Sequence, residues 1–354
     1  MNGLQSNRIL WIDFCRIYAA FFVVLRHVHC KTGTVGYYLD LFNYRGLIFF
    51  FFVVSGYFMH SSLSWSGGMR RGWTLLRLYL FWAIVSFMPL FCIDHWEEIL
   101  QGEWKALSLL SFLDGIGLVP CWPHHFPLNQ PLWFLKALFV LAVISPCLFR
   151  MSSKMLVCLC VFCLAGSDIL MKVDVWEHTS SFSVSWIPPR AFESAMALAF
   201  FSGGILIRRH VSYESFGSFV HEHAWCPIVA SLVLFPMVRL WGFDPPCRSS
   251  ALVLLSVMTI MGIGAVVERA FPRFFLYAAK WGSAAFFVYV THFVFTAFLC
   301  RVEPALCSVQ WDNVRGIVVP VSAFGTSLAL YRLLCWLSPS FMETFALVKR
   351  PKMN

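Results

Sequence analysis

The sequence predicts an all-α fold: a polytopic membrane bundle of about ten transmembrane helices with both termini in the cytoplasm. Of its 354 residues, 59% are hydrophobic and only 13% are charged, whereas a soluble domain carries about 25% charged residues. Apolar runs long enough to cross a bilayer recur along the chain. No polar block between them is long enough to fold by itself, so we expect residues 1–354 to form a single transmembrane domain with an outer loop at 94–131.

Basic residues set the expected orientation of the spans. Fourteen Lys and Arg residues fall in loops on the side of the N-terminus, and six fall in loops on the other side. Because positive loops stay in the cytoplasm, both termini are expected there, and the net charge of +9 needs no nucleic-acid partner. The ten expected spans are 9–29, 43–60, 73–93, 132–150, 154–171, 190–207, 225–241, 251–267, 284–300 and 314–337.

The first span is unusually polar. It carries Asp13, Arg16 and His27, and charges at membrane depth are costly unless they face protein or a water-filled cavity. Arg16 and His27 are eleven residues apart, which places them on one face of a helix and about 16 Å apart along its axis. Asp13 precedes Arg16 by three residues and is within its reach. We therefore expect one side of this helix to present an acid, a guanidinium and an imidazole.

The next two spans each allow two interpretations. Ser55-Gly56 in the second span permits close helix approach; alternatively, the Ser55 hydroxyl is a nucleophile, although it has no partner nearby in sequence. Arg70, Arg71 and Arg77 lie at the start of the third span. Guanidinium groups bind phosphate oxygens, so these residues suit a phosphate-bearing ligand. They equally fit the cytoplasmic surplus of basic residues and contact with lipid headgroups.

The outer loop 94–131 and the fourth span supply further polar candidates. A loop of this length is usually either functional or disordered, and His124 and His125 near its end are ligands, acid–base groups or solvated loop residues. Trp133 is expected as an interfacial anchor. Lys136, one turn into the membrane, either extends to the surface or lines a cavity.

Later spans contain two more buried candidates and no expected metal site. Glu193 lies three residues after Arg190 in the sixth span and can pair with it. His292 lies inside the ninth span, where it either bonds a neighbouring helix or joins the polar face of the first span. The three cysteines at 158–163 lie within an apolar span, which is unusual for structural zinc, so no metal is expected.

An ordered set of motifs resembles the membrane acyltransferase type 3 family. The first motif is Arg16 and His27, separated by ten residues, within IDFCRIYAAFFVVLRH. The others are FFFFVVSGYF in the second span, the arginines and RLY of the third, PLWFLKAL in the fourth, Phe200-Phe201 with Gly203 in the sixth, and YVTH in the ninth. Each motif alone is weakly specific for the family. Their occurrence in this order along most of the chain is more specific. The outer loop departs from the family pattern, so the resemblance says least about the identity of the acceptor.

The resemblance implies an enzyme that moves an acetyl or other short acyl group from cytoplasmic acyl-CoA to a hydroxyl of a cell-surface glycan or its lipid-linked precursor. We expect His27 to be the general base, because imidazole titrates near neutral pH. Arg16 and the three arginines of the third span would bind the CoA phosphates or polarise the thioester carbonyl, with Asp13 fixing Arg16. The candidates for the cavity or the acceptor side are Ser55, Trp133, Lys136, Glu193 and His292.

The expected partners are acyl-CoA, the saccharide acceptor and membrane lipids, and the expected location is a bacterial inner membrane. Two rival functions share the same polar features. Charged groups inside the membrane also mark substrate paths, so a transporter or flippase for a glycan-related substrate is one alternative. The sequence halves show no convincing self-similarity of the kind that transporters often have. The other alternative is a non-catalytic membrane subunit whose polar strip serves helix assembly.

Overall fold

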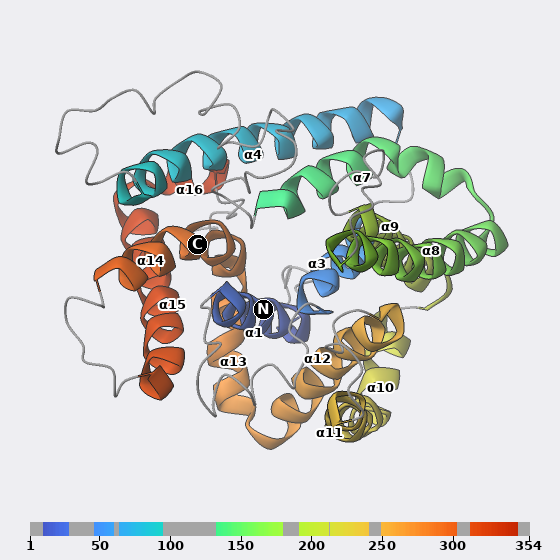
Figure 1. Cartoon of the computed structure of the whole chain (residues 1–354). Helices are drawn as coiled ribbons and strands as arrows, with labels where there is room; N and C mark the ends of the chain where they lie inside the picture. The colour runs from blue at the N-terminus through green and yellow to red at the C-terminus, as the bar shows by residue number, and fades with distance from the viewer. Residues whose placement is uncertain are drawn as a thin grey trace, which may run out of the picture. The chain divides into compact units, whose positions relative to one another are not determined.

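The computed structural model describes residues 10–27, 46–59, 64–94, 132–179, 191–211, 213–240, 249–302 and 312–345, which are helical and contain no strand (Figure 1). The all-α prediction is therefore confirmed for this part of the chain. The long helices are α1 (Leu10–His27), α3 (Gly46–Phe58), α4 (Trp65–Asp94), α7 (Trp133–Arg150), α8 (Ser153–Thr179), α9 (Ala191–His210), α11 (Trp225–Leu240), α12 (Ser250–Ala270), α14 (Ala285–Val302) and α15 (Asp312–Leu337). The short ones are α10 (Tyr213–Glu222), α13 (Pro272–Lys280), the 3₁₀ turn η4 (Trp281–Ala284) and α16 (Pro339–Phe345).

Each predicted span overlaps one long helix, although several boundaries differ. The third span was predicted from residue 73, but α4 begins at Trp65, and α8 continues beyond residue 171 to Thr179. The short helices α10, α13 and α16 lie in segments predicted as connections, because runs of this length are too short for a span. Within the described residues, six helices are long and apolar enough to cross a membrane, or seven if the bent pair α10–α11 is one span. The chain is thus a multi-pass membrane protein.

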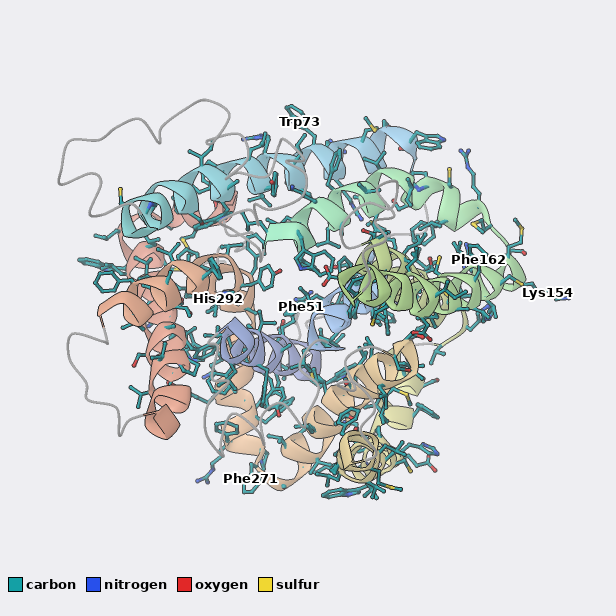
Figure 2. All side chains as sticks on the ribbon, viewed as in Figure 1. Phe51, Trp73, Lys154, Phe162, Phe271 and His292 are labelled. Atoms are coloured by element: carbon teal, nitrogen blue, oxygen red, sulfur yellow. The ribbon has the colours of Figure 1, made fainter. Side chains whose placement is uncertain are left out.

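Large apolar side chains cover much of the helix surface. Phe162 of α8 is 76% exposed and Trp73 of α4 is 60% exposed. Trp73 points away from its helix, as does Phe271 at the junction of α12 and α13 (Figure 2). Exposed apolar side chains in such numbers are costly in water and suit contact with lipid chains.

The chain divides into two compact units. Unit 1 comprises Met1–Ala19, Tyr37–Met69 and Val140–Gly282, and unit 2 comprises Ala20–Gly36, Arg70–Phe139 and Ser283–Asn354. The helices α1, α4 and α7 contribute residues to both units. The single-domain organisation stays a prediction.

In unit 1, α3 and α9 approach each other through glycines. A Cβ added to Gly56 would clash with the carbonyl oxygen of Phe201, and one added to Gly204 would clash with the carbonyl oxygen of Val53. Helices in membranes pack closely where small residues face each other. This reciprocal contact confirms the packing interpretation of Gly56. The contact on α9 is made by Gly204 and not by the motif residue Gly203, beside which a Cβ would meet open space.

Two helix ends in unit 1 are capped by side chains from other helices. The guanidinium of Arg209 donates to two carbonyls at the end of α7, at 2.6 and 2.7 Å. The carboxylate of Asp168 in α8 accepts from the backbone N–H and the hydroxyl of Ser250, at 2.8 and 2.9 Å, at the start of α12. Both side chains bond backbone groups that lack partners within their own helix.

Aromatic contacts organise unit 2. The indole N–H of Trp82 in α4 donates to the carbonyl of Phe345 at 2.8 Å, and the ring of Phe81 stacks on Phe345 with centroids 4.0 Å apart. The ring centroid of Phe287 in α14 lies 5.5 Å from that of Trp82 and 5.8 Å from that of Tyr331 in α15. The short helix α16 is therefore anchored on α4, and α14 packs against both α4 and α15.

Candidate functional site

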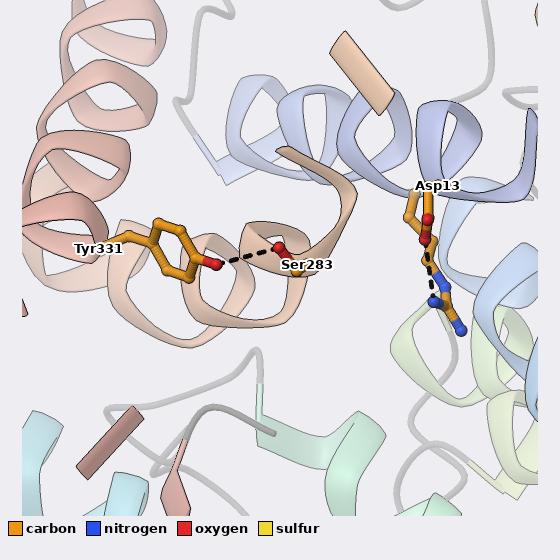
Figure 3. A network of polar contacts seen from close by, with 4 residues as sticks. Asp13, Ser283 and Tyr331 are labelled. Carbon is orange, nitrogen blue, oxygen red and sulfur yellow. Dashed lines mark hydrogen bonds and ion pairs between the residues drawn. The ribbon is translucent and has the colours of Figure 1, made fainter. Parts of the chain in front are cut away.

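The first turns of α1 place an acid beside a guanidinium. Nη1 of Arg16 lies 3.4 Å from Oδ1 of Asp13, so the predicted contact is present (Figure 3). The Asp13 side chain is 9% exposed and that of Arg16 is 35% exposed. Cζ of Arg16 also lies 5.7 Å from the ring centroid of Phe58, at the end of α3. The carboxylate and the ring together fix the direction of the guanidinium.

Gly282 presses against the backbone of α1 at Asp13. A Cβ at Gly282 would lie 2.5 Å from Cβ of Asp13 and 2.6 Å from its carbonyl oxygen, so no larger residue fits without movement. The next residue, Ser283, forms a 3.0 Å hydrogen bond between its hydroxyl and that of Tyr331 (Figure 3). Sequence reasoning missed Gly282, for which the only signal was a glycine in a short segment between two spans.

His27 is the last residue of α1, and its side chain lies outside the described part of the chain. α1 is continuous from Leu10 to His27, so the helical repeat puts positions 16 and 27 on one face. The role of His27 stays a prediction.

The arginines expected to bind the donor are exposed along the first turns of α4. Arg70, Arg71 and Arg77 all have exposed side chains. The hydroxyl of Thr74 donates to the carbonyl of Arg70, one turn earlier in the same helix, at 3.0 Å. Exposure leaves both interpretations open: binding of a phosphate-bearing ligand and contact with lipid headgroups.

The polar candidates of α7 and α14 belong to an aromatic group in unit 2. Nζ of Lys136 lies 5.1 Å from the ring centroid of Tyr79. His292 is fully buried, and its Nδ1–H donates to the carbonyl of Val288, one turn earlier in the same helix, at 3.1 Å. Its ring centroid is 6.1 Å from that of Tyr289. The two predictions for His292, a bond to a neighbouring helix and a contact with the polar face of the first span, stay predictions.

The remaining candidates differ in their exposure and in whether they belong to the described part of the chain. Trp133 and Ser55 are half-buried, as is Glu193 in the first turn of α9. Three further residues lie outside the described part of the chain: Arg190, His124 and His125.

Cysteines of α8 face different surroundings. Cys163 is buried, Cys158 is exposed, and the thiol of Cys160 contacts the carbonyl of Ala199 at 3.4 Å. Among the described residues, no group of three or more His, Cys, Asp or Glu side chains is arranged to hold a metal ion.

Two adjacent aromatic residues at the end of α3 each lie beneath a guanidinium. Arg16 of α1 lies over Phe58, and Arg208 of α9 lies over Tyr57, with Cζ 5.6 Å from the ring centroid. Sequence reasoning treated Arg208 only as a sign of orientation, and Tyr57 only as part of a motif. Nothing in the spacing of the chain links residues 57 and 208.

A family model described as an acyltransferase domain matches residues 9–336. The chain belongs to the acyltransferase 3 family. The acyltransferase 3 match starts just before α1 and ends in α15, so it includes Asp13, Arg16 and His27 and helices of both units. Searches of curated proteins and of solved structures gave no match. Membership of the acyltransferase 3 family, together with the apolar helices, makes the protein a membrane acyltransferase.

Proposed function

We propose that the protein transfers an acetyl or other short acyl group from cytoplasmic acyl-CoA to a hydroxyl of a cell-surface glycan or its lipid-linked precursor. The observation that carries the proposal is the polar face of α1, which lies within the acyltransferase match. On that face Asp13 contacts Arg16 at 3.4 Å, and position 27 follows three turns later.

The proposal includes an orientation: ten spans, both termini in the cytoplasm, and a bacterial inner membrane. The distribution of basic residues supports it, with fourteen on one side and six on the other. Arg16 then lies in the inner half of α1 and His27 near its outer end. The donor enters from the cytoplasm and the acceptor from outside.

The chemistry requires one base and one cation. An imidazole nitrogen of His27 takes the proton of the acceptor hydroxyl, whose oxygen attacks the thioester carbonyl. The new C–O bond forms as the C–S bond breaks, and the CoA sulfur leaves with the proton from the imidazolium. Arg16 binds a CoA phosphate or polarises the carbonyl, and Asp13 keeps Arg16 in place. The arginines of α4 supply further phosphate contacts.

The transfer is direct or proceeds through an acyl-enzyme. In the direct route the CoA arm reaches into the bundle as far as the acceptor. In the covalent route an acyl group on His or Ser passes between the two substrates, and the enzyme shows ping-pong kinetics. Initial rates at varied concentrations of both substrates separate the two routes.

The test of the base is His27→Ala, assayed by transfer of labelled acetyl from acetyl-CoA to envelope glycans and by mass spectrometry of those glycans. Loss of a general base typically costs about 10²–10⁴-fold in rate. His223→Ala, an exposed histidine in the same chain, is the matched control and should keep wild-type activity. Near wild-type transfer by His27→Ala would exclude the assigned role. Movement of an unmodified glycan precursor without labelling would favour the flippase alternative.

The test of the cation is Arg16→Ala, with Arg16→Lys beside it. We expect Arg16→Ala to raise the KM for acyl-CoA about tenfold or more, since charge-assisted hydrogen bonds are strong. Arg16→Lys keeps the charge but loses the planar guanidinium that can form two parallel hydrogen bonds. Its KM for acyl-CoA should therefore lie between those of the wild type and Arg16→Ala. Unchanged KM and kcat in Arg16→Ala would rule out a donor-binding role.

A further inference from the structure

Unit 1 contains a second set of polar groups that the proposed reaction leaves unused. It gathers where α1 begins and where α3 and α9 end, and its members are Trp11, Tyr57 and Arg208. Phe216 of α10 packs between the first two, with ring centroids 5.6 Å from Trp11 and 6.1 Å from Tyr57. Cζ of Arg208 lies 5.6 Å from the centroid of the Tyr57 ring. We call Trp11, Tyr57 and Arg208 the Trp11 cluster.

Two members of the Trp11 cluster bury a hydrogen-bond donor. Trp11 is 6% exposed and Tyr57 is 5% exposed. The indole N–H and the phenol hydroxyl have no hydrogen-bond partner among the residues that the structure describes. Buried donors in native proteins are nearly always paired, because an unpaired one is costly. The two atoms are therefore available to a ligand that supplies acceptor oxygens.

The charge of the Trp11 cluster further narrows the chemical class of the ligand. The Arg208 side chain is exposed and lies over the Tyr57 ring, and Arg16 lies over the ring of the next residue, Phe58. The two rings have centroids 5.4 Å apart. Two guanidinium groups thus lie over adjacent rings at the end of α3, and the two uncharged donors belong to rings that both contact Phe216. Groups of this kind match phosphate oxygens, which accept several charge-assisted hydrogen bonds.

We propose that the Trp11 cluster binds a phosphate group, namely a phosphate of the CoA part of the donor. The inference rests on the proposed function for the identity of the donor. A phospholipid headgroup carries the same chemistry and is the other source. Both buried donors are closed to solvent and Phe216 contacts both rings, so a ligand reaches the donors only when neighbouring side chains move. Phe216 belongs to a ten-residue helix that meets α11 at a 49° bend.

The experiment measures direct binding to the purified full-length chain in neutral detergent. CoA and short-chain phosphatidylglycerol are titrated separately against the wild type, Arg208→Gln and Tyr57→Phe. We expect Arg208→Gln to weaken CoA binding by at least about tenfold. Tyr57→Phe keeps the ring beneath Arg208 and removes only a hydroxyl, so a loss of about fivefold to tenfold reports the hydrogen bond to the ligand.

Two matched controls isolate these effects. Arg273→Gln removes the same charge from an exposed position on α13. Ser327→Ala removes another buried hydroxyl without a partner among the described residues, in α15. Both variants should bind CoA with wild-type affinity. Thermal unfolding of all variants verifies that each is folded.

The outcomes are distinct. Weaker CoA binding with unchanged phosphatidylglycerol binding identifies the donor phosphate, and the reverse identifies a lipid headgroup in the same site. If Arg208→Gln and Tyr57→Phe bind both ligands like the wild type, the Trp11 cluster is not a phosphate site. If the wild type binds CoA, both variants bind it more weakly and no acyl group is transferred, the proposed function fails while the site stands. If it transfers acyl groups and both variants keep their CoA affinity, the site fails while the function stands.

Discussion

At the residue scale, Asp13 is in contact both with Arg16 of its own helix and with Gly282. Its carboxylate contacts Arg16, and its backbone is pressed by Gly282. An ion pair whose arginine is 35% exposed contributes little to stability, about 0–1 kcal/mol. We therefore interpret the pair as a device that orients the guanidinium. Gly282 matters because it permits the approach that sets the position of Asp13.

Gly282→Ala tests this interpretation. The added Cβ would meet the backbone of Asp13, and forcing an extra methyl into a packed contact costs about 1–3 kcal/mol. We expect a lower melting temperature in detergent and a raised KM for acyl-CoA, because Asp13 shifts away from Arg16. Gly166→Ala in α8 is the control, since among the described residues no atom beyond the local helix backbone lies within 4 Å of its added Cβ. Equal stability and equal KM in the two variants would contradict the assigned role of Gly282.

At the scale of elements, helix packing in unit 1 depends on a few small residues and on caps supplied across helices. Gly56 and Gly204 allow α3 and α9 to meet backbone to backbone. Ser249 occupies the N-cap position of α12, but its side chain makes no capping hydrogen bond, and the first turn is bonded instead by Asp168 from α8. The elements are thus fixed by groups that lie far from them in sequence.

Adjacent glycines in α9 provide a matched test of the α3–α9 contact. Gly204→Ala would push a methyl group into the carbonyl of Val53, whereas Gly203→Ala adds one into open space. We expect Gly204→Ala to lose about 1–3 kcal/mol of stability. Gly203→Ala should be neutral or gain up to about 1 kcal/mol, because Ala favours helix over Gly. Thermal unfolding in detergent measures the stability of both variants. Equal losses of stability would show that the close α3–α9 contact at Gly204 does not stabilise the protein.

At the scale of the whole molecule, the apolar surface and the basic loops make a joint prediction about orientation. Six or seven of the described helices are long and apolar enough to cross a membrane. The count of ten spans is still a prediction. α3 has only 13 residues, and its glycine lets it pack backbone to backbone on α9. Its length suits a span that is buried in protein and not surrounded by lipid.

Reporter fusions test the orientation. A fluorescent protein fused after Asn354 should fluoresce, and alkaline phosphatase fused there should be inactive, because the two reporters are active on opposite sides of the membrane. Phosphatase inserted within the connection 94–131 should be active. The positive-inside rule supplies the physical reason, given the fourteen basic residues on the side of the termini. The reverse pattern of activities would overturn the orientation and with it the cytoplasmic donor.

The sequence by itself determined the helical class, the positions of the long helices and the Asp13–Arg16 pair. These depend on local composition and on spacing within one helix, which the periodicity of the chain contains. The short helices α10, α13 and α16 were harder to predict, because seven to ten residues of mixed polarity are typical of both short helices and loops.

Only the tertiary structure decided that Gly282 lies against Asp13, that Arg208 lies over Tyr57, and that Gly204 and not Gly203 contacts α3. Residues 57 and 208 belong to helices separated by more than a hundred residues, and their meeting depends on how side chains of many helices fill space together. That packing is a property of the assembled unit, so no spacing along a single helix reveals it.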